Sequence, residues 1–204
     1  MTCLRLIVIA ASAGGSEALE RVASQLPADL HAALLVVLHT PEGSPRYNAE
    51  TLQRHTRFRV RYAAEGNIPT SGQILLAPPG EHLVVREDGR LGLNGGSEVN
   101  FAMPAADCLF ISAANVFREQ VIGVVLTGGG MDGSAGLVAI KARGGMCVVQ
   151  SPADAQAPSM PIHAIIRDSP NYVVLLDDLG PLLKEMVTSP DVAGQDGSAR
   201  CSAD

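Results

Sequence analysis

The chain has 204 residues, enough for one ordinary domain with a substantial buried core. Hydrophobic residues make up 47% of it but aromatic residues only 3%, which favours a core of Ala, Val, Leu and Ile, as in parallel sheets covered by helices. The formal charge of -6 argues against nucleic-acid binding, which requires a basic surface.

The cysteines and the apolar runs indicate in which compartment the protein works and which kinds of site it lacks. Its four cysteines stand far apart and form no C-x-x-C pair, so they indicate neither a zinc site nor a disulfide framework. The sequence has no uninterrupted run of about 18 apolar residues, the length that a membrane-spanning helix requires. The first apolar run leads into a glycine turn and lacks a signal-peptide cleavage site. We therefore expect a cytoplasmic protein that neither spans a membrane nor binds nucleic acid, metal or cofactor.

The first part of the chain alternates strand-like and helix-like segments. A β-branched run over 4–11 ends in the turn Ser12-Ala13-Gly14-Gly15, and helical spacing of apolar residues follows over 16–26. A second strand is expected over 34–39, followed by an amphipathic stretch over 47–55. Strands that alternate with helices predict a parallel sheet.

Between residues 58 and 94 the pattern changes to short strands. The segment ILLAP is followed by HLVVR and RLGLN, and Asp88-Gly89 between the last two is a strong turn signal. We expect a small antiparallel hairpin here, at one edge of the sheet.

The rest of the chain returns to the alternating pattern. Helices are expected over 102–117, 134–142, 163–167 and 179–187, and strands over 121–127, 146–150 and 172–176. The sequence thus predicts an α/β fold with a doubly wound, mostly parallel sheet and helices on both faces. Residues 1–187 form one domain in this interpretation, and the polar residues 188–204 form a disordered tail.

Three polar residues stand at the ends of predicted strands. Ser12 follows the first strand, His39 ends the second, and Asp132 lies in the loop after 121–127. The carboxyl ends of parallel strands meet at one edge of the sheet, where ligands bind. A serine hydroxyl needs an imidazole to take its proton, and the imidazole needs a carboxylate to orient it. The set therefore predicts acyl-transfer chemistry, with the oxyanion near the helix after Ser12.

Each residue also has a simpler interpretation. Ser12 could be a helix N-cap, His39 a strand-end histidine bonded to backbone, and Asp132 the cap of the helix that begins near residue 133. Helix capping or core hydrogen bonding accounts for Asp107 and His82 without a metal. The G-x-S-x-G motif of α/β-hydrolases is not met, because Ala10 replaces its first glycine, and the glycine turns match no nucleotide-binding motif.

An ordered set of segments carries a resemblance to a known family. The segments, in chain order, are IVIAASAGGSEAL, LLVVLHT, ILLAPPGEHL, AADCLF, VIGVVLTGGGMDGSAGL and GGMCVVQSPADAQAPSMP. Together they resemble the catalytic domain of the chemotaxis protein-glutamate methylesterases, from residue 6 to about 186. The family commonly carries a receiver domain before this one, and this chain begins at the first strand, so we expect a stand-alone catalytic domain.

The resemblance implies a reaction and a set of site residues. It implies hydrolysis of glutamate γ-methyl esters on the cytoplasmic helices of methyl-accepting chemoreceptors, with glutamine deamidation as a related activity. It places Ser12 as the nucleophile, His39 as the base and Asp132 as the orienting carboxylate. Gly129 would supply an oxyanion contact through its backbone, and Ala13 would line the same oxyanion and substrate site.

Three departures from the family pattern leave alternatives open. The family usually has glycine at Ala10, threonine at Ala13 and methionine at Gly129. One lost transition-state contact can cost an order of magnitude or more in rate. Ala13 and Gly129 therefore motivate a second hypothesis, a catalytically weakened receptor-binding module. A small-molecule serine esterase outside chemotaxis is a third.

Overall fold

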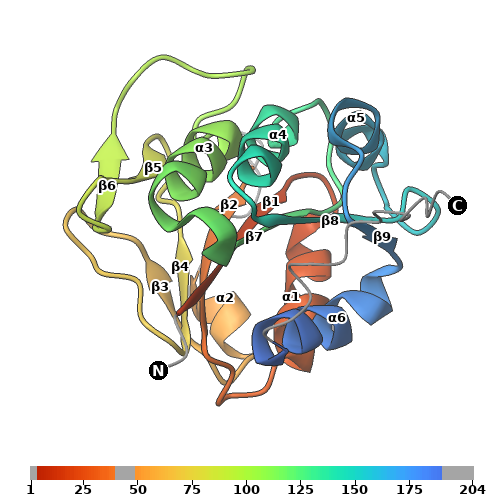
Figure 1. Ribbon diagram of the computed structural model, residues 1–204, viewed down its shortest axis with the longest axis horizontal. Coiled ribbons are helices and arrows are strands. Elements are labelled where there is room, and N and C mark those ends of the chain that lie inside the picture. Colours follow the sequence, from red (N-terminus) through yellow and green to blue (C-terminus); the bar gives the residue numbers. More distant parts are fainter. Residues whose placement is uncertain (1–3, 40–48, 190–204) are drawn as a thin grey trace, which may run out of the picture.

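The computed structural model of the protein describes residues 4–39 and 49–189. Within these residues, seven parallel strands form one sheet in the order β3-β4-β2-β1-β7-β8-β9 (Figure 1). The strands of this sheet are β1 (Arg5–Ala11), β2 (Ala32–Leu38), β3 (Arg59–Tyr62), β4 (Gln73–Leu76), β7 (Val121–Val125), β8 (Met146–Gln150) and β9 (Tyr172–Val174). The central strands are buried on both faces, which explains their continuous apolar runs.

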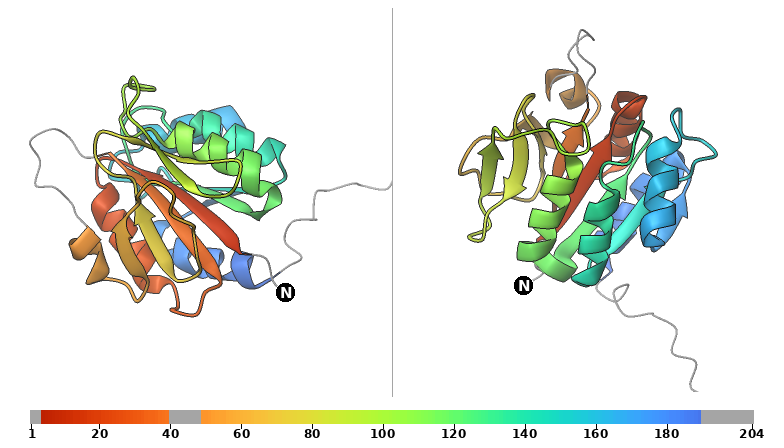
Figure 2. Two further views of the ribbon diagram at one scale, coloured as in Figure 1. Left: turned by 90° about the vertical axis from the view of Figure 1, so that its left-hand side faces the viewer. Right: turned by 90° about the horizontal axis from the view of Figure 1, so that it is seen from above.

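Helices cover both faces of the sheet, as predicted (Figure 2). One face carries α1 (Gly15–Gln25), α2 (Ala49–Gln53) and α6 (Leu176–Thr188). The other carries α3 (Ala106–Phe117), α4 (Ser134–Ala142) and α5 (Ser159–Asp168), with the short 3-10 helix η1 (Arg118–Gln120) after α3. Successive residues of β1 point to opposite faces of the sheet. Ile7 packs on the face that α1, α2 and α6 cover, and Val8 packs on the face that α3, α4 and α5 cover.

The order of the strands makes β1 the centre of a doubly wound sheet. The chain first builds outward from β1 through β2, and it returns to the other side of β1 with β7. The direction of winding therefore reverses between β1 and β7. A crevice outside the carboxyl ends of the strands forms at such a switch point.

The predicted antiparallel hairpin is confirmed as β5 (His82–Val85) and β6 (Leu91–Asn94). It forms a two-stranded sheet of its own, packed against α3. Leu83 and Leu91 join the core on that face, and the Val85 N–H donates to Ser112 Oγ at 2.9 Å. His82 bridges the hairpin to the start of α3, because its Nδ1 accepts from the Ala105 N–H at 3.0 Å.

Helix boundaries differ from the prediction where prolines lie. The start of α3 is Ala106 and not residue 102, because Pro104 disfavours a helical conformation in the residue before it. α6 begins before residue 179 and continues through Pro181, which cannot bond the Asp177 carbonyl one turn earlier. Gln25 Nε2 from α1 donates to that carbonyl at 3.1 Å and replaces the missing bond.

Two expectations extend beyond the described residues. The first part of the amphipathic stretch over 47–55 and the tail from residue 190 lie outside them. In residues 4–39 and 49–189, no helix has both the length and the apolar character needed to cross a membrane.

Candidate active site

Ser12 lies at the switch point of the sheet, between the ends of β2 and β7. Its N–H donates to the Thr127 carbonyl at 3.0 Å, and the His39 N–H donates to the Ala11 carbonyl at 2.9 Å. These bonds continue the strand pairing by one residue beyond β1 and β2. Gly128 packs beside Ser12, since a Cβ added there would lie 2.8 Å from Ser12 Cβ and against Met160 Sδ. The strand-end argument thus predicted the position of Ser12.

The His39 and Asp132 side chains meet at this edge. His39 Nε2 lies 2.9 Å from Asp132 Oδ2, with 19% of the His39 side chain and 4% of the Asp132 side chain exposed. The two atoms are close, but the contact does not have the geometry of a well-aligned hydrogen bond. Hydrogen bonds of catalytic groups are often loose before substrate binds and tighten in the complex.

Backbone N–H groups hold the Asp132 carboxylate in place. Oδ2 accepts from the Ala106 N–H at 2.6 Å, and Oδ1 accepts from the Asp107 and Gly133 N–H groups at 3.0 Å each. Ala106 and Asp107 are the first two residues of α3, whose N–H groups have no partner within the helix. Asp132 therefore caps α3 across a separation of 25 to 26 residues, and not α4, whose own N-cap is Gly133.

Asp107, in the first turn of α3, caps α4 in the same way. Its Oδ1 accepts from the Gly136 N–H in the first turn of α4 at 2.7 Å, and its Oδ2 accepts from Asn100 Nδ2 at 2.7 Å. The loop before α4 thus caps α3, while the first turn of α3 caps α4. The expectation that capping accounts for Asp107 is correct, but the helix it caps is not its own.

Burial acts on the two carboxylates with different results. Burial alone would raise the pKa of Asp132, but the His39 contact and the Ala106 and Asp107 N–H groups outweigh it and lower that pKa below its usual value. Burial raises the pKa of Asp107, and its donors do not compensate fully. A lowered pKa keeps Asp132 ionised, which suits a group that stabilises a charged imidazole.

The expected hydrogen bond between Ser12 and His39 is not formed. Among the described residues, the Ser12 hydroxyl forms no hydrogen bond, so none joins it to His39. Ser12 is also not a helix N-cap, because Gly14, with φ 72°, takes that position in α1. The structure thus places Ser12 beside a preformed His39–Asp132 pair without a bond between them.

Ala13 and Gly129 lie exposed around Ser12. Neither N–H donates to another group of the described residues, so both are available to an oxyanion. A Cβ added at Gly129 would meet nothing within 4 Å, so the absent side chain leaves open space. The Ala13 carbonyl accepts from Thr127 Oγ1 at 3.0 Å, which fixes this turn.

Thr127 and Gln150 support the site and were not singled out from the sequence. The Thr127 N–H donates to Gln150 Oε1 at 2.8 Å, and Thr127 Oγ1 accepts from the Ala157 N–H at 2.8 Å. Both side chains are buried. Each is a polar residue at the end of an apolar strand. The rule that identified Ser12 and His39 could therefore have identified these two residues from the sequence as well.

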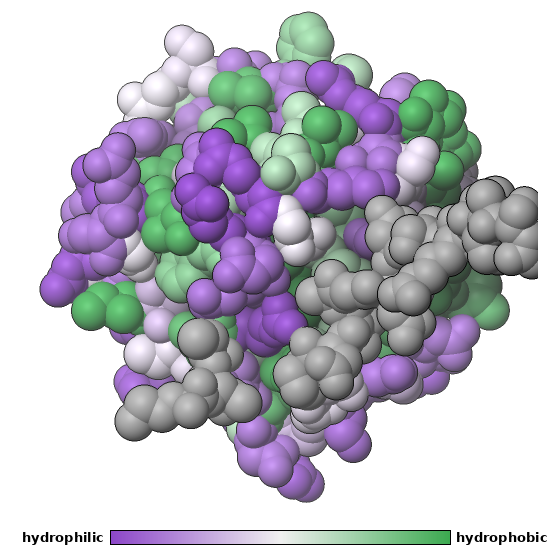
Figure 3. Space-filling model, viewed as in Figure 1, coloured by the Kyte–Doolittle hydropathy of each residue, from purple (hydrophilic) through white to green (hydrophobic). Residues whose placement is uncertain are grey.

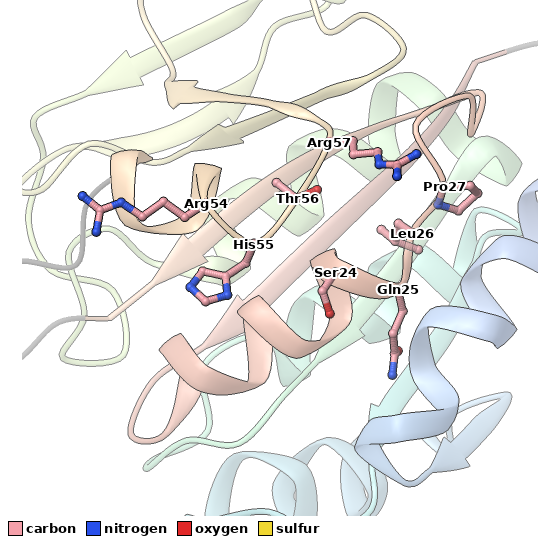
Figure 4. Close-up of a pocket in the computed structure, with 8 residues that line it drawn as sticks. All are labelled: Ser24, Gln25, Leu26, Pro27, Arg54, His55, Thr56 and Arg57. Atoms are coloured by element: carbon pink, nitrogen blue, oxygen red, sulfur yellow. The ribbon is translucent and has the colours of Figure 1, made fainter.

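A surface cavity of about 420 Å³ lies elsewhere, at the amino-end edge of the sheet. Its lining comes from the C-terminal end of α1 and the segment before β3 (Figure 4). The side chains of Arg54 and Gln25 point away from its centre. No group of three or more His, Cys, Asp or Glu side chains that could hold a metal occurs in the part of the chain that the structure describes.

Comparisons with known proteins point to one family. The sequence model of the family described as CheB methylesterase matches residues 7–183. The protein-glutamate methylesterase/protein-glutamine glutaminase of Symbiobacterium thermophilum is 38% identical over 157 residues, which are 77% of this chain and 43% of that protein. A putative protein of the same description from Leptospira interrogans is 35% identical over 176 residues, covering 86% of this chain and 91% of that one.

A solved structure supports the same assignment. The crystal structure of the Thermotoga maritima CheB methylesterase catalytic domain superposes with a TM-score of 0.85 at 28% sequence identity, covering 91% of this chain and 100% of that one. The chain spans about half the length of several curated relatives, including 54% of the protein-glutamate methylesterase FrzG of Myxococcus xanthus. From the family match, the relatives and the fold together, this chain belongs to the CheB methylesterase family.

Proposed function

We propose that this chain hydrolyses glutamate γ-methyl esters on the cytoplasmic helices of chemoreceptors and that glutamine deamidation is a related activity of the same site. The observation that carries the proposal is the His39–Asp132 pair, 2.9 Å apart beside Ser12 at the switch point of a family fold. The site lies within one domain over residues 1–187, and such a substrate places the protein in the cytoplasm.

Each residue has a role in the proposed mechanism. Ser12 Oγ attacks the ester carbonyl while His39 takes its proton, and Asp132 stabilises the resulting imidazolium. The N–H groups of Gly129 and Ala13 stabilise the oxyanion. His39 then gives the proton to the departing methoxide, which leaves as methanol. Water, activated by His39, attacks the acyl-enzyme and releases the glutamate carboxylate and Ser12.

The separation of Ser12 from His39 favours a second candidate, a weakened receptor-binding module. A site without the Ser12–His39 hydrogen bond, and with open space at Gly129, could bind a receptor without turning it over. The two candidates differ in one measurable quantity, the release of methanol. A small-molecule serine esterase differs from both, because it would hydrolyse p-nitrophenyl acetate and leave methylated receptors unchanged.

The test measures methanol release from methylated chemoreceptor cytoplasmic fragments by the wild type and by Ser12→Ala. We expect the rate to fall at least about a thousandfold in the variant. Ser24→Ala is the matched control, because Ser24 is an exposed serine on α1 that donates only to the Arg21 carbonyl. No release by folded wild-type protein from several receptors would refute the proposal.

A further inference from the structure

Phe101, in the loop between β6 and α3, is 99% exposed, the largest value among the exposed large hydrophobic side chains of the described residues. Single exposed hydrophobic residues are common on proteins. A fully solvated aromatic ring is a stronger feature, because Phe is among the residues that gain most from burial. Figures 1 and 2 show the loop rising beyond α3, and Figure 3 shows hydrophobic atoms at that upper rim of the molecule.

A specific turn holds the ring in solvent. The Val99 and Ala102 backbones exchange hydrogen bonds of 3.1 and 3.0 Å, which close a tight loop around Asn100 and Phe101. These two residues adopt left-handed φ angles of 53° and 61°, a conformation that side chains with a Cβ disfavour. Asn tolerates this conformation more readily than other such residues, so the turn accepts strain chiefly at Phe101, which it presents outward. Strain of this kind is concentrated at functional sites.

The turn is tied directly to the candidate active site. Asn100 Nδ2 donates to Asp107 Oδ2 at 2.7 Å, and the Asp107 N–H donates to Asp132 Oδ1 at 3.0 Å. Phe101 is therefore connected, through Asn100, Asp107 and two hydrogen bonds, to the carboxylate that faces His39. Met131, next to Asp132 in the sequence, is 43% exposed and adds a second apolar side chain near the site. The backbone at Phe101 is thus tied to the segment that carries the candidate site.

We propose that Phe101 is a specificity-determining residue that docks the protein substrate, its ring packing on apolar side chains of the receptor helix next to the esterified glutamate. This inference rests on the proposed function, which supplies the helical substrate. An amphipathic helix repeats its apolar residues at spacings of three and four, so such residues flank a glutamate on its surface. Packing of this kind strengthens binding of the protein substrate. A small ester has no such helix, so the Phe101 ring does not affect its binding.

The experiment measures the dissociation constant of a fluorescent methylated receptor fragment by anisotropy, for the wild type, Phe101→Ala and Phe101→Leu. Phe101→Gly is included because it removes the ring and also relieves the positive φ. Ile166→Ala is the matched control, since Ile166 is 77% exposed on α5, outside the turn. KM and kcat for methanol release and the hydrolysis of p-nitrophenyl acetate are measured on the same proteins.

We expect Phe101→Ala and Phe101→Gly to raise the dissociation constant and KM about tenfold or more, as loss of a buried aromatic anchor does. kcat and the hydrolysis of p-nitrophenyl acetate should stay within about twofold, and Phe101→Leu should recover part of the affinity. Equal affinity of Phe101→Ala and wild type, or no binding by the wild type, overturns the inference. So does self-association of the wild type that Phe101→Ala abolishes. Weakened binding without methanol release by any protein would support the docking role and refute the methylesterase proposal.

Discussion

Replacing Asp132 by asparagine changes one carboxylate oxygen to an amide nitrogen at nearly constant size. The carboxylate accepts three backbone N–H groups and contacts His39. If the amide nitrogen takes the place of Oδ1, the Asp107 and Gly133 N–H groups lose their acceptor. If it takes the place of Oδ2, only the Ala106 N–H does, so the second orientation is favoured. One buried donor without a partner costs about 1–3 kcal/mol, and loss of the charge at the N-terminus of α3 adds up to about 1 kcal/mol.

The favoured orientation also changes the histidine. The amide nitrogen then faces His39 Nε2 and donates a hydrogen bond to it, so the ring hydrogen moves to Nδ1. Nδ1 is the only other ring nitrogen, and once protonated it cannot take the Ser12 proton. In serine hydrolases the same substitution lowers kcat about 10⁴-fold through the wrong tautomer. We expect a loss of similar size in methanol release from methylated receptor fragments.

The two effects are measured on one preparation, by urea unfolding and by methanol release. Asp178→Asn is the control, because Asp178 is an exposed carboxylate in the first turn of α6, and its loss should cost less than about 1 kcal/mol. The reasoning is refuted if Asp132→Asn keeps more than about a tenth of the wild-type kcat. A free energy of unfolding equal to that of the wild type would separately refute the capping role.

Three further predictions follow from the same contacts. Gly128→Ala would place a Cβ 2.8 Å from Ser12 Cβ, so we expect a loss of about 1–3 kcal/mol in thermal unfolding and slower ester hydrolysis. Because the pKa of Asp107 is raised in the folded state, which then binds more protons than the unfolded state, its contribution to stability falls as pH rises from the usual carboxyl pKa through the raised one. Urea unfolding from pH 4 to 7 should show this fall in the wild type and not in Asp107→Asn. Burial raises the pKa of the Cys147 thiol, so iodoacetamide at pH 8 should label it, by peptide mass spectrometry, at least about a hundredfold more slowly in the native protein than in urea. Equal labelling rates would contradict the burial.

The strands and the edge that carries the site could be predicted from local sequence. Buried parallel strands are continuous apolar runs, and each ends where polar or glycine residues begin, so the strand ends can be located without tertiary information. The direction of the strands then brings Ser12, His39 and Asp132 to one edge, and the structure places two of them 2.9 Å apart. The predicted start of α6 was wrong. Pro181 leaves the Asp177 carbonyl without its bond within the helix, and the replacement bond comes from Gln25 on a distant helix.

The partner of Asp132 could not be read from the sequence. Local rules assign an aspartate just before a helix to that helix, which here means α4. The structure assigns it to α3, because α3 and α4 pack with their N-termini side by side and each receives a carboxylate from the other. This arrangement depends on how closely the helices approach, a tertiary property that no spacing of residues encodes.

That approach determines how rigid each part of the site is. At Gly136 the α3–α4 contact is close enough that an added Cβ would collide with Phe110 Cβ, so the two helices, and with them the Asp132 carboxylate, have little freedom. Ser12 is also fixed at its backbone, by Thr127, and its Cβ lies against Gly128. The main freedom left to Ser12 is rotation about χ1, which has three staggered positions. In the proposed mechanism, substrate binding therefore needs to select one serine rotamer, because His39 and Asp132 already lie 2.9 Å apart.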